Sequence, residues 1–110
     1  MSTRVYVPTT LSGLAGFVAD GSVPESAGRL TAADESEESE YAALMDAAVE
    51  SAALLTGTGR RVVVVAEVAN PSGAIAIERV VAVHVDTEDD ADEDDDLAWF
   101  ASQEIPDILG

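Results

Sequence analysis

The fold follows from one apolar segment, RRVVVVAEVA, at residues 60–69. Its four consecutive valines, Val62–Val65, are β-branched and favour an extended backbone. A short, uninterrupted apolar run of this kind is typical of a strand that is buried on both faces. The turn-forming stretch at 70–73, Asn-Pro-Ser-Gly, follows directly. We therefore predict that residues 74–85 return beside this strand as the second arm of a hairpin.

Periodicity and turn residues place the other elements on both sides of that hairpin. Pro8 ends a first strand, Thr9 or Thr10 caps a helix that Gly21 closes, and Gly57 ends a second, longer helix. In chain order, the expected elements are a strand at 4–8, a helix at 11–20, a strand at 29–32, a helix at 39–56, strands at 60–69, 74–85 and 97–100, and a short helix or turn at 103–109.

Each of the two main helices has one apolar face in the sequence. In the first helix, residues spaced i, i+3, i+4 and i+7 form it, namely Leu11, Leu14, Ala15 and Val18. The second helix directs Asp46 and Glu50 away from its apolar face, which consists of Tyr41, Leu44, Met45, Ala48, Ala52 and Leu55. Helices between successive strands indicate crossover connections. We therefore expect an α/β (α+β) fold in one domain, residues 1–110, with a small mixed sheet, the order β-α-β-α-β-β-β, and both helices packed on one face.

The net charge of −17 is unevenly distributed along the chain. Of the 22 acidic residues, five lie in 34–40 and nine in 86–96, which leaves eight acids against the five arginines elsewhere. The first cluster precedes the long helix, where negative charge favours the positive end of the helix dipole. The second, 86–96, is expected to be an acidic flexible loop, because blocks of like charge repel one another and stay solvated.

Composition excludes several classes of function. The chain has no Cys, so disulfides, Cys-based zinc sites and a Cys nucleophile are ruled out. Five scattered arginines and no Lys disfavour direct binding to nucleic acid or to an anionic membrane surface. The most apolar stretch, 62–85, contains charged residues and a proline, so it does not form a membrane span. We therefore expect a cytoplasmic protein.

The acidic loop carries the candidate site residues. Counted as a calcium loop from Asp90, it has Asp95 where Gly is needed and Ala101 where the bidentate Glu is needed. Asp90, Asp92 and Asp94 are the remaining metal-ligand candidates, and a solvated loop without metal is the competing interpretation. A third interpretation is a contact surface for a basic partner, formed by Asp89, Asp90, Asp92, Glu93, Asp94 and Asp95.

Arg60 and Arg61 are expected close to this loop. If 70–73 form the turn, these arginines pair across the hairpin with residues near Val83, and the acidic run leaves the sheet at Asp86. The adjacent bases then lie beside the densest acids. We expect partial mutual neutralisation there, through exposed pairs worth about 0–1 kcal/mol each.

No catalytic or cofactor-binding residues are predicted. His84 is the only histidine, and it lies on the strand face opposite Val83, without the partners that acid–base catalysis needs. The segment 57–59, Gly-Thr-Gly, lacks the third glycine of a dinucleotide-binding motif. Trp99 in the last strand is expected to be a core residue.

Several segments resemble a family of small uncharacterised actinobacterial proteins. They are the RVYVP start at 4–8, EYAA at 40–43, RRVVVV at 60–65 and the WF..QE ending at 99–104. The resemblance spans nearly the whole chain. It implies the same arrangement of strands and helices and an actinobacterial cytoplasm, which agrees with the absence of Lys. It implies no activity, ligand or catalytic residue.

The sequence favours a non-catalytic protein-binding or regulatory domain without a cofactor. Its partner would be a protein with a basic surface, met through the acidic loops or an exposed strand edge. The alternative is a divalent-metal-dependent enzyme or metal binder that uses the carboxylates of 86–96 with Glu37, Glu38 and Glu40. A third class, a nucleic-acid mimic, needs acids at fixed spacing on a rigid surface. The sequence does not determine the oligomeric state.

Overall fold

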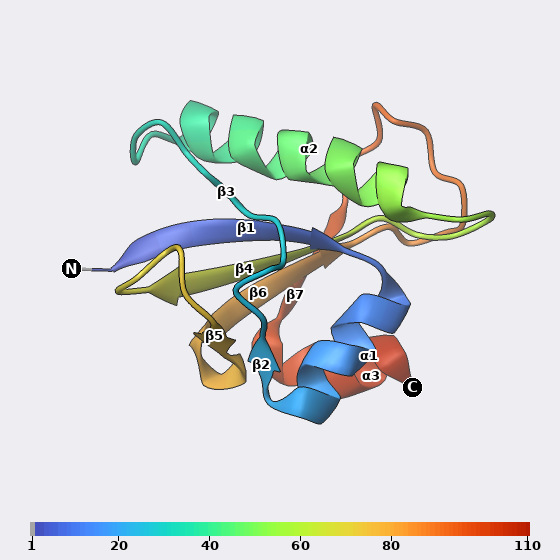
Figure 1. The fold of residues 1–110 in the computed structure, drawn as a ribbon. Coiled ribbons are helices and arrows are strands. Elements are labelled where there is room, and N and C mark those ends of the chain that lie inside the picture. The colour runs from blue at the N-terminus through green and yellow to red at the C-terminus, as the bar shows by residue number, and fades with distance from the viewer. Residues whose placement is uncertain (1) are drawn as a thin grey trace.

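A five-stranded sheet runs through the middle of the structure, a computed structural model that describes residues 2–110 (Figure 1). Its strand order is β3-β1-β4-β6-β7, and a second, two-stranded sheet joins β2 to β5. In Figure 1, α2 lies above the large sheet, and α1 and α3 lie below it. The elements are β1 (Thr3–Thr9), α1 (Leu11–Asp20), β2 (Ser22–Val23), β3 (Leu30–Thr31), α2 (Glu37–Leu54), β4 (Val62–Val68), β5 (Ile75–Ala76), the 3₁₀ turn η1 (Ile77–Arg79), β6 (Val80–Val85), β7 (Ala98–Ala101), the 3₁₀ turn η2 (Ser102–Glu104) and α3 (Ile105–Leu109).

The predicted α+β fold class and the order of the main elements are confirmed, and two details of the prediction are corrected. Within the described residues the sheet is antiparallel rather than mixed, because the chain turns back after α1 through β2 and enters β3 antiparallel to β1, with Leu30 opposite Tyr6. The helices also lie on opposite faces of the sheet, not on one face.

Both faces of the sheet are apolar, so each needs its own helical layer. Successive strand residues point to opposite sides. Val5 and Val7 therefore pack with Leu14 of α1 and Ile105 of α3, whereas Tyr6 packs in the cluster beneath α2. The valine run of β4 is buried, as predicted. Helices on a single face would leave half of these apolar side chains in water.

α2 packs on the sheet through small side chains. Its buried residues are Ala43, Ala47, Ala48 and Ser51. The predicted apolar face is wrong at Tyr41 and Ala52, which are exposed. A helix that lies against a sheet surface of branched valines accommodates small residues at the contact, and the bulky ones turn outward.

A buried hydroxyl fixes α2 to the end of the β1–β4 ladder. The Ser51 Oγ donates to the carbonyl oxygen of Thr9 (2.6 Å) and accepts from the N–H of Val62 (2.8 Å), where these two strand residues are paired. Ser51 is fully buried, and both of its contacts are made to main-chain groups that the strands would otherwise leave unpaired. The C-terminal half of α2 is thereby held over the start of β4.

α1 covers the opposite face through Leu11, Leu14 and Phe17. The first two were predicted on this face, but Ala15 and Val18, also predicted there, are exposed. The helix is therefore rotated toward its one aromatic residue, which has more apolar area to bury. None of the helices in residues 2–110 combines the length and hydropathy needed to cross a bilayer.

The predicted hairpin is confirmed in the half that lies away from its turn at 70–73. Val62 lies opposite Val85, and the pairing continues to Val65 and Ala82. The long strand predicted over 74–85 is interrupted, because β5 leaves to pair with β2 and η1 then leads the chain back into β6. This register places the start of β4 next to the end of β6, where the acidic loop begins.

Candidate functional site

The candidate site lies where β4 begins and β6 ends. Because Val62 lies opposite Val85, the residues just outside them, Arg61 and Asp86, face each other. The guanidinium of Arg61 donates to both carboxylate oxygens of Asp86, from Nε to Oδ2 and from Nη2 to Oδ1, each at 2.8 Å. The Arg61 backbone N–H also donates to Oδ2 (2.8 Å), and the Asp86 N–H donates to the Arg61 carbonyl (3.1 Å).

Arg61 and Asp86 form a buried ion pair. Their exposed fractions are 5% and 3%. Removing two charges from water is unfavourable unless the geometry is good and the remaining polar atoms are bonded. The two-point contact meets that condition. The side-chain hydrogen bond to Asp86 is the largest effect on the pKa of Arg61, and it raises this pKa above the ordinary value. Burial acts in the opposite direction. The guanidinium therefore stays charged.

The acidic loop folds around the same guanidinium. Nη2 of Arg61 donates to the carbonyl oxygens of Asp92 (3.2 Å) and Asp95 (2.9 Å), and Nη1 donates to that of Glu93 (3.3 Å). The loop thus contacts Arg61 through its main chain, and the residues themselves are exposed. One buried cation organises the loop and leaves the negative charge of its side chains at the surface.

A second contact joins the loop to the connection between α2 and β4. The N–H of Asp90 donates to the Gly59 carbonyl (2.9 Å), and the Gly59 N–H donates to Oδ1 of Asp90 (3.3 Å). Asp90 has a φ of 53°, in the left-handed region that Asp adopts more readily than most residues. Arg60 and Asp89 form an exposed ion pair (3.3 Å), which is of the kind that the sequence predicted between the adjacent arginines and the acidic run.

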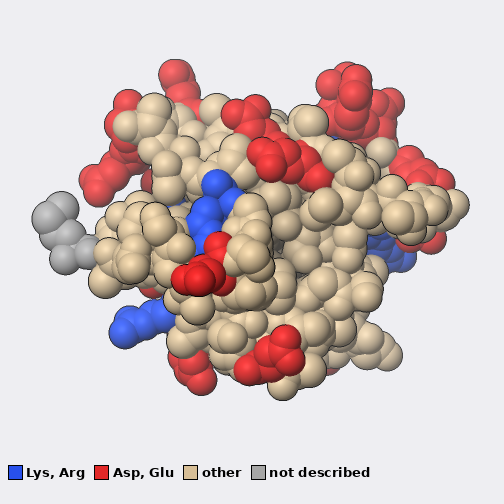
Figure 2. Space-filling model, in the orientation of Figure 1, with Lys and Arg blue, Asp and Glu red and all other residues tan. Residues whose placement is uncertain are grey.

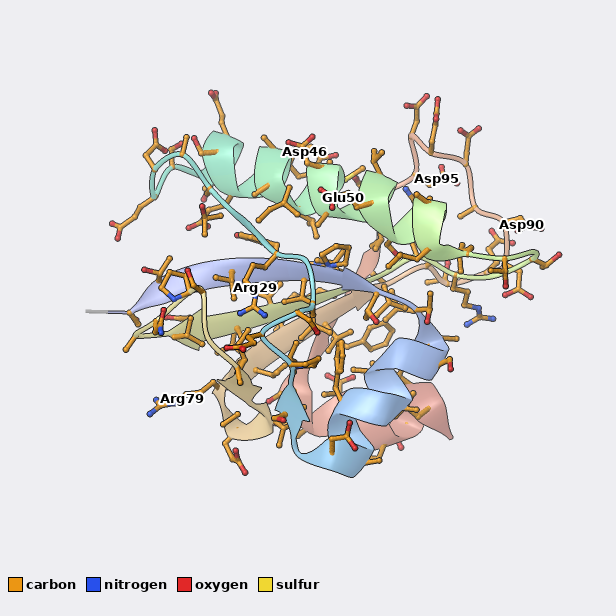
Figure 3. The ribbon with its side chains drawn as sticks, in the orientation of Figure 1. Arg29, Asp46, Glu50, Arg79, Asp90 and Asp95 are labelled. Carbon is orange, nitrogen blue, oxygen red and sulfur yellow. The ribbon has the colours of Figure 1, made fainter. Side chains whose placement is uncertain are left out.

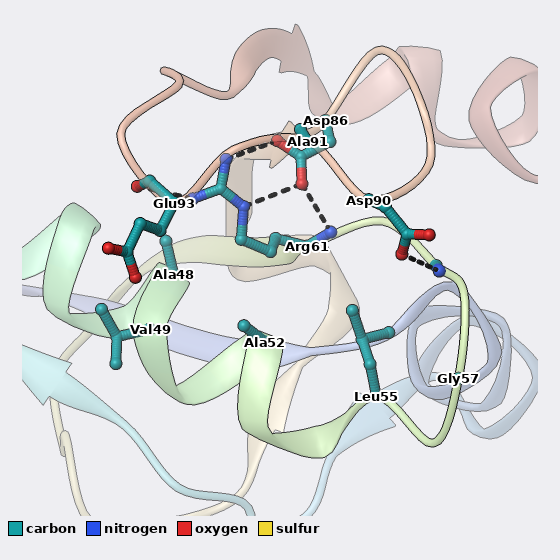
Figure 4. Close-up of a pocket in the computed structure, with 11 residues that line it drawn as sticks. Ala48, Val49, Ala52, Leu55, Gly57, Arg61, Asp86, Asp90, Ala91 and Glu93 are labelled. Carbon is teal, nitrogen blue, oxygen red and sulfur yellow. Dashed lines mark hydrogen bonds and ion pairs between the residues drawn. The ribbon is translucent and has the colours of Figure 1, made fainter.

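An open cleft of about 370 Å³ separates the loop from the C-terminal half of α2 (Figure 4). Each guanidinium nitrogen of Arg61 already donates to Asp86 or to the loop. No buried side-chain nitrogen or oxygen in residues 2–110 lacks a partner. The cleft therefore presents no unpaired buried polar group to a ligand, and the ion pair is a structural anchor. The apolar wall consists of Ala48, Val49, Ala52 and Leu55.

The metal candidates are distributed along the loop. Across residues 2–110, no three His, Asp or Glu side chains lie so that they could hold a metal ion. Oδ1 of Asp92 accepts from the N–H of Asp94 (3.4 Å), and Asp90 is bonded to Gly59. Metal binding by Asp90, Asp92 and Asp94 stays a prediction. So do the partner surface, Asp89 to Asp95, and the flexibility of 86–96, although Asp86 itself belongs to the core.

Two further titratable groups lie on the α2 side of the sheet. His84 is half-buried opposite Trp99, and burial lowers its pKa below the ordinary value. The Tyr41 hydroxyl on α2 donates to Oδ1 of Asp96 (2.6 Å), and this bond raises the pKa of Tyr41. The hydrogen bond between Tyr41 and Asp96 joins α2 to the end of the acidic loop.

The structure corrects the expectation that Trp99 is a core residue. Its exposed fraction is 59%. α2 packs on β1, β3 and β4, so the end of the sheet that carries β7 is left without a helical cover on this side. Trp99 lies at that end, on the outermost strand.

Sequence reasoning placed Arg61 near the acidic run, but it missed the burial of Arg61 and expected it opposite residues near Val83, which lies opposite Val64 instead. It placed Arg61 beside the acids in an exposed pair, whereas the structure buries it and adds three loop carbonyls. The available signal was position, because Arg61 directly precedes a buried valine run and Asp86 directly follows the last apolar residue of the paired strand. Opposite charges that face each other next to a buried pair of strand residues are expected to form an ion pair, because an unpaired buried charge is unfavourable.

The whole of this fold, from the start of β1 to the end of α3, matches one family model. Residues 3–109 match a family of unknown function, DUF6912. The chain belongs to this family. The DUF6912 match includes Arg61, Asp86 and the acidic loop, and it confirms the expected membership of an uncharacterised family. No curated protein and no solved structure matches the chain.

Proposed function

We propose that the protein is a non-catalytic protein-binding or regulatory domain of an actinobacterial cytoplasm, and that its partner has a basic surface. One observation carries the proposal: the acidic loop is bonded to the buried Arg61 through its main chain, and its carboxylates are left at the surface. The exposed acids are Glu88, Asp89, Asp90, Asp92, Glu93, Asp94, Asp95 and Asp96.

The charge distribution favours a basic partner. No Lys or Arg follows Arg79 in the sequence. On the face shown in Figure 2, acidic side chains gather along the upper rim and also lie at the centre and lower edge, while the bases form small separate patches. Figure 3 shows that Asp46 and Glu50 add to this rim from the outer side of α2. A field of one sign accelerates and orients the approach of an oppositely charged protein.

Most of the arginines form hydrogen bonds or ion pairs with other groups of the chain. Arg29 donates to the main-chain carbonyls of Pro24 (2.8 Å) and Pro71 (3.1 Å), so it holds two loops together. Arg61 is buried, and Arg4 contacts Glu67 at 3.1 Å. Arginines used in this way are not offered to an anionic ligand. The exposed charge is therefore predominantly negative, which favours a partner with a basic surface.

The proposal is tested with a ten-residue peptide of alternating Lys and Thr. In one variant, the six predicted partner-surface acids become their amides, which keep the loop's acceptor oxygens: Asp89→Asn, Asp90→Asn, Asp92→Asn, Glu93→Gln, Asp94→Asn and Asp95→Asn. The matched control removes six exposed acids elsewhere: Asp20→Asn, Glu25→Gln, Glu35→Gln, Glu37→Gln, Glu38→Gln and Glu78→Gln.

The two variants carry the same net charge, so they separate a local surface from a general field. We expect the loop variant to bind the peptide about tenfold more weakly than the control does, because close charges act most strongly. Calorimetry or anisotropy measures both dissociation constants. Equal weakening in the two variants would show that only the total charge matters, and the proposal would fail.

The metal-dependent alternative gives a different result in a separate titration. Mg²⁺, Mn²⁺ and Ca²⁺ are added while the fluorescence of Trp99 and the thermal stability are followed. The binding-domain proposal predicts no saturable stabilisation at sub-millimolar metal, since scattered carboxylates attract cations only diffusely. A saturable rise in stability that the loop variant abolishes would replace the proposal with the metal-dependent one.

A further inference from the structure

β7 is one of the two edge strands of the five-stranded sheet. Within residues 2–110, it pairs with β6 and with no other strand. The opposite edge strand, β3, has only two residues, whereas β7 has four. Very short edge strands are one of the ways in which proteins prevent unwanted pairing. The β7 edge lacks that protection.

Hydrogen-bond alternation fixes which groups of β7 point outward. In an antiparallel sheet, a residue directs its N–H and C=O to one neighbouring strand, and the next residue directs them to the other. The bond from Asp86 N–H to the Arg61 carbonyl means that Val85 directs its groups away from β4 and toward Ala98 of β7. The same alternation turns the main-chain N–H and C=O of Trp99 away from β6, toward the free edge.

A contact two residues further along agrees with this assignment. Ala101 has the same parity as Trp99, and its N–H donates to Oε1 of Glu104 (3.2 Å) instead of to a strand. Glu104 thereby closes the end of the edge with its own carboxylate. The open main-chain groups are at Trp99.

The Trp99 side chain adds a second feature to the same position. It is 59% exposed and lines a shallow cleft of about 220 Å³ with Tyr6, His84 and Arg4. The charge of Arg4 is already paired with Glu67 (3.1 Å). A Lys or Arg side chain binds favourably over an indole face. The acids that end the loop are separated from β7 by Leu97 alone, and Glu104 and Asp107 follow the strand. The edge is therefore flanked by negative charge at both ends.

We infer that β7 is the strand on which the partner docks: an extended basic segment of the partner adds to the free edge as a sixth strand and sets a Lys or Arg on Trp99. This inference rests on the proposed function and specifies the binding mode. Main-chain bonds to Trp99 supply strand pairing, and the flanking acids supply the selection for basic segments. A second copy of the chain is disfavoured as occupant, since it would bring another net charge of −17 to the same edge.

Two substitutions of Trp99 separate the contribution of its main-chain N–H to peptide binding from the contribution of its indole side chain. Trp99→Val removes the indole and keeps the outward N–H, whereas Trp99→Pro removes both. Proline is tolerated where the N–H faces away from the sheet, so β6–β7 pairing survives. We expect Trp99→Pro to bind the Lys-Thr peptide about tenfold more weakly than Trp99→Val, from the lost edge contact. Circular dichroism verifies that both variants fold.

A chemically modified peptide provides an independent test in which the protein is unchanged. A fully N-methylated peptide of the same sequence keeps every charge and loses its main-chain donors. We expect it to bind the natural protein at least about tenfold more weakly than the unmethylated peptide. Equal binding of the two peptides, together with equal affinities of the two Trp99 variants, would overturn strand addition.

The outcomes distinguish this inference from the proposed function. Loss of binding in the loop variant, with no effect of Trp99→Pro or N-methylation, would retain the acidic partner surface and refute docking on β7. If none of these changes weakened peptide binding, both the docking on β7 and the proposed function would be refuted. A concentration-dependent dimer that Trp99→Pro abolishes, measured by sedimentation, would assign the edge to a second copy and also overturn the inference.

Discussion

The two acidic segments, 34–40 and 86–96, are similar in composition but are held in different ways. In the first, the hydrogen bonds are local: Ser36 Oγ accepts from the Ser39 N–H (3.2 Å) and caps α2, and Asp34 Oδ1 accepts from the Ser36 N–H (2.8 Å). Its ion pair with a distant segment, between Glu40 and Arg4 (3.6 Å), is partly exposed. In the second, the contacts with Arg61 span 25 to 34 residues of the chain. A similar density of acidic residues thus starts a helix in one place and surrounds a buried cation in the other.

The largest expected effect comes from breaking the anchor of the second segment. Asp86→Ala leaves Arg61 charged, buried and without its carboxylate, which typically costs about 3–5 kcal/mol of the free energy of unfolding. Urea denaturation measures this loss. Glu38→Ala, an exposed acid of the first segment, is the control and should cost under about 1 kcal/mol. Similar losses in the two variants would mean that the segments do not differ.

A smaller effect is expected from Arg61→Lys, which keeps the charge and removes the planar fork. An ammonium group cannot reach Asp86 at two points and the three loop carbonyls together, so we expect a loss of about 2 kcal/mol. Hydrogen exchange of the backbone, read by mass spectrometry, should accelerate in 88–95 and stay unchanged in 34–40. If the loop of the natural protein already exchanges as an unstructured peptide does, the predicted flexibility is right and the anchoring is wrong.

The first segment is weakened by removing its helix cap. Ser36→Ala deletes the oxygen that accepts the Ser39 N–H, and loss of such a cap costs about 1 kcal/mol. Thermal or urea unfolding measures the change, with Ser26→Ala in an exposed loop as the matched control. Exchange in 88–95 should not respond. Faster exchange there would show that the two segments are coupled.

The smallest effect concerns Tyr41, whose bond to Asp96 joins α2 to the acidic loop. This bond raises the pKa of Tyr41, so its contribution to stability is complete below about pH 10 and is lost as pH rises through the folded-state value. Asp96→Asn should lower the pKa of Tyr41 toward the ordinary value. The tyrosinate absorbance measures this shift, and Tyr41→Phe assigns it.

Tyr6 provides the internal control in the same titration. Burial, the largest effect, raises its pKa, and it lies in the core beneath α2, so Asp96→Asn should leave it unchanged. A shift of both tyrosines would indicate a general change of field, and the specific contact would be excluded.

The elements could be predicted because local chemistry decides them. Branched valines at 62–65, the turn at 70–73 and the cap and stop residues of α1, Thr10 and Gly21, each act within a few residues. The ends of α2 were predicted only approximately, since it begins at Glu37 after the cap Ser36 and ends at Leu54. The proximity of Arg60 and Arg61 to the acidic run was also predicted, but the register was wrong: Val83 lies opposite Val64, because β5 and η1 interrupt the arm that follows the turn. The packing faces of α1 and α2 could not be derived in full, because periodicity does not say which of several apolar residues fits the opposing sheet.

By itself, the sequence determined that this chain forms an α+β domain with an acidic segment on each side of a valine-rich hairpin. Only the tertiary structure decided that the helices cover opposite faces, that Trp99 is exposed at a free edge, and that Arg61 is buried within the acidic loop. Propensities and turns are properties of neighbouring residues. Burial and charge pairing depend on which distant segments meet, and the packing of both sheet faces fixes that.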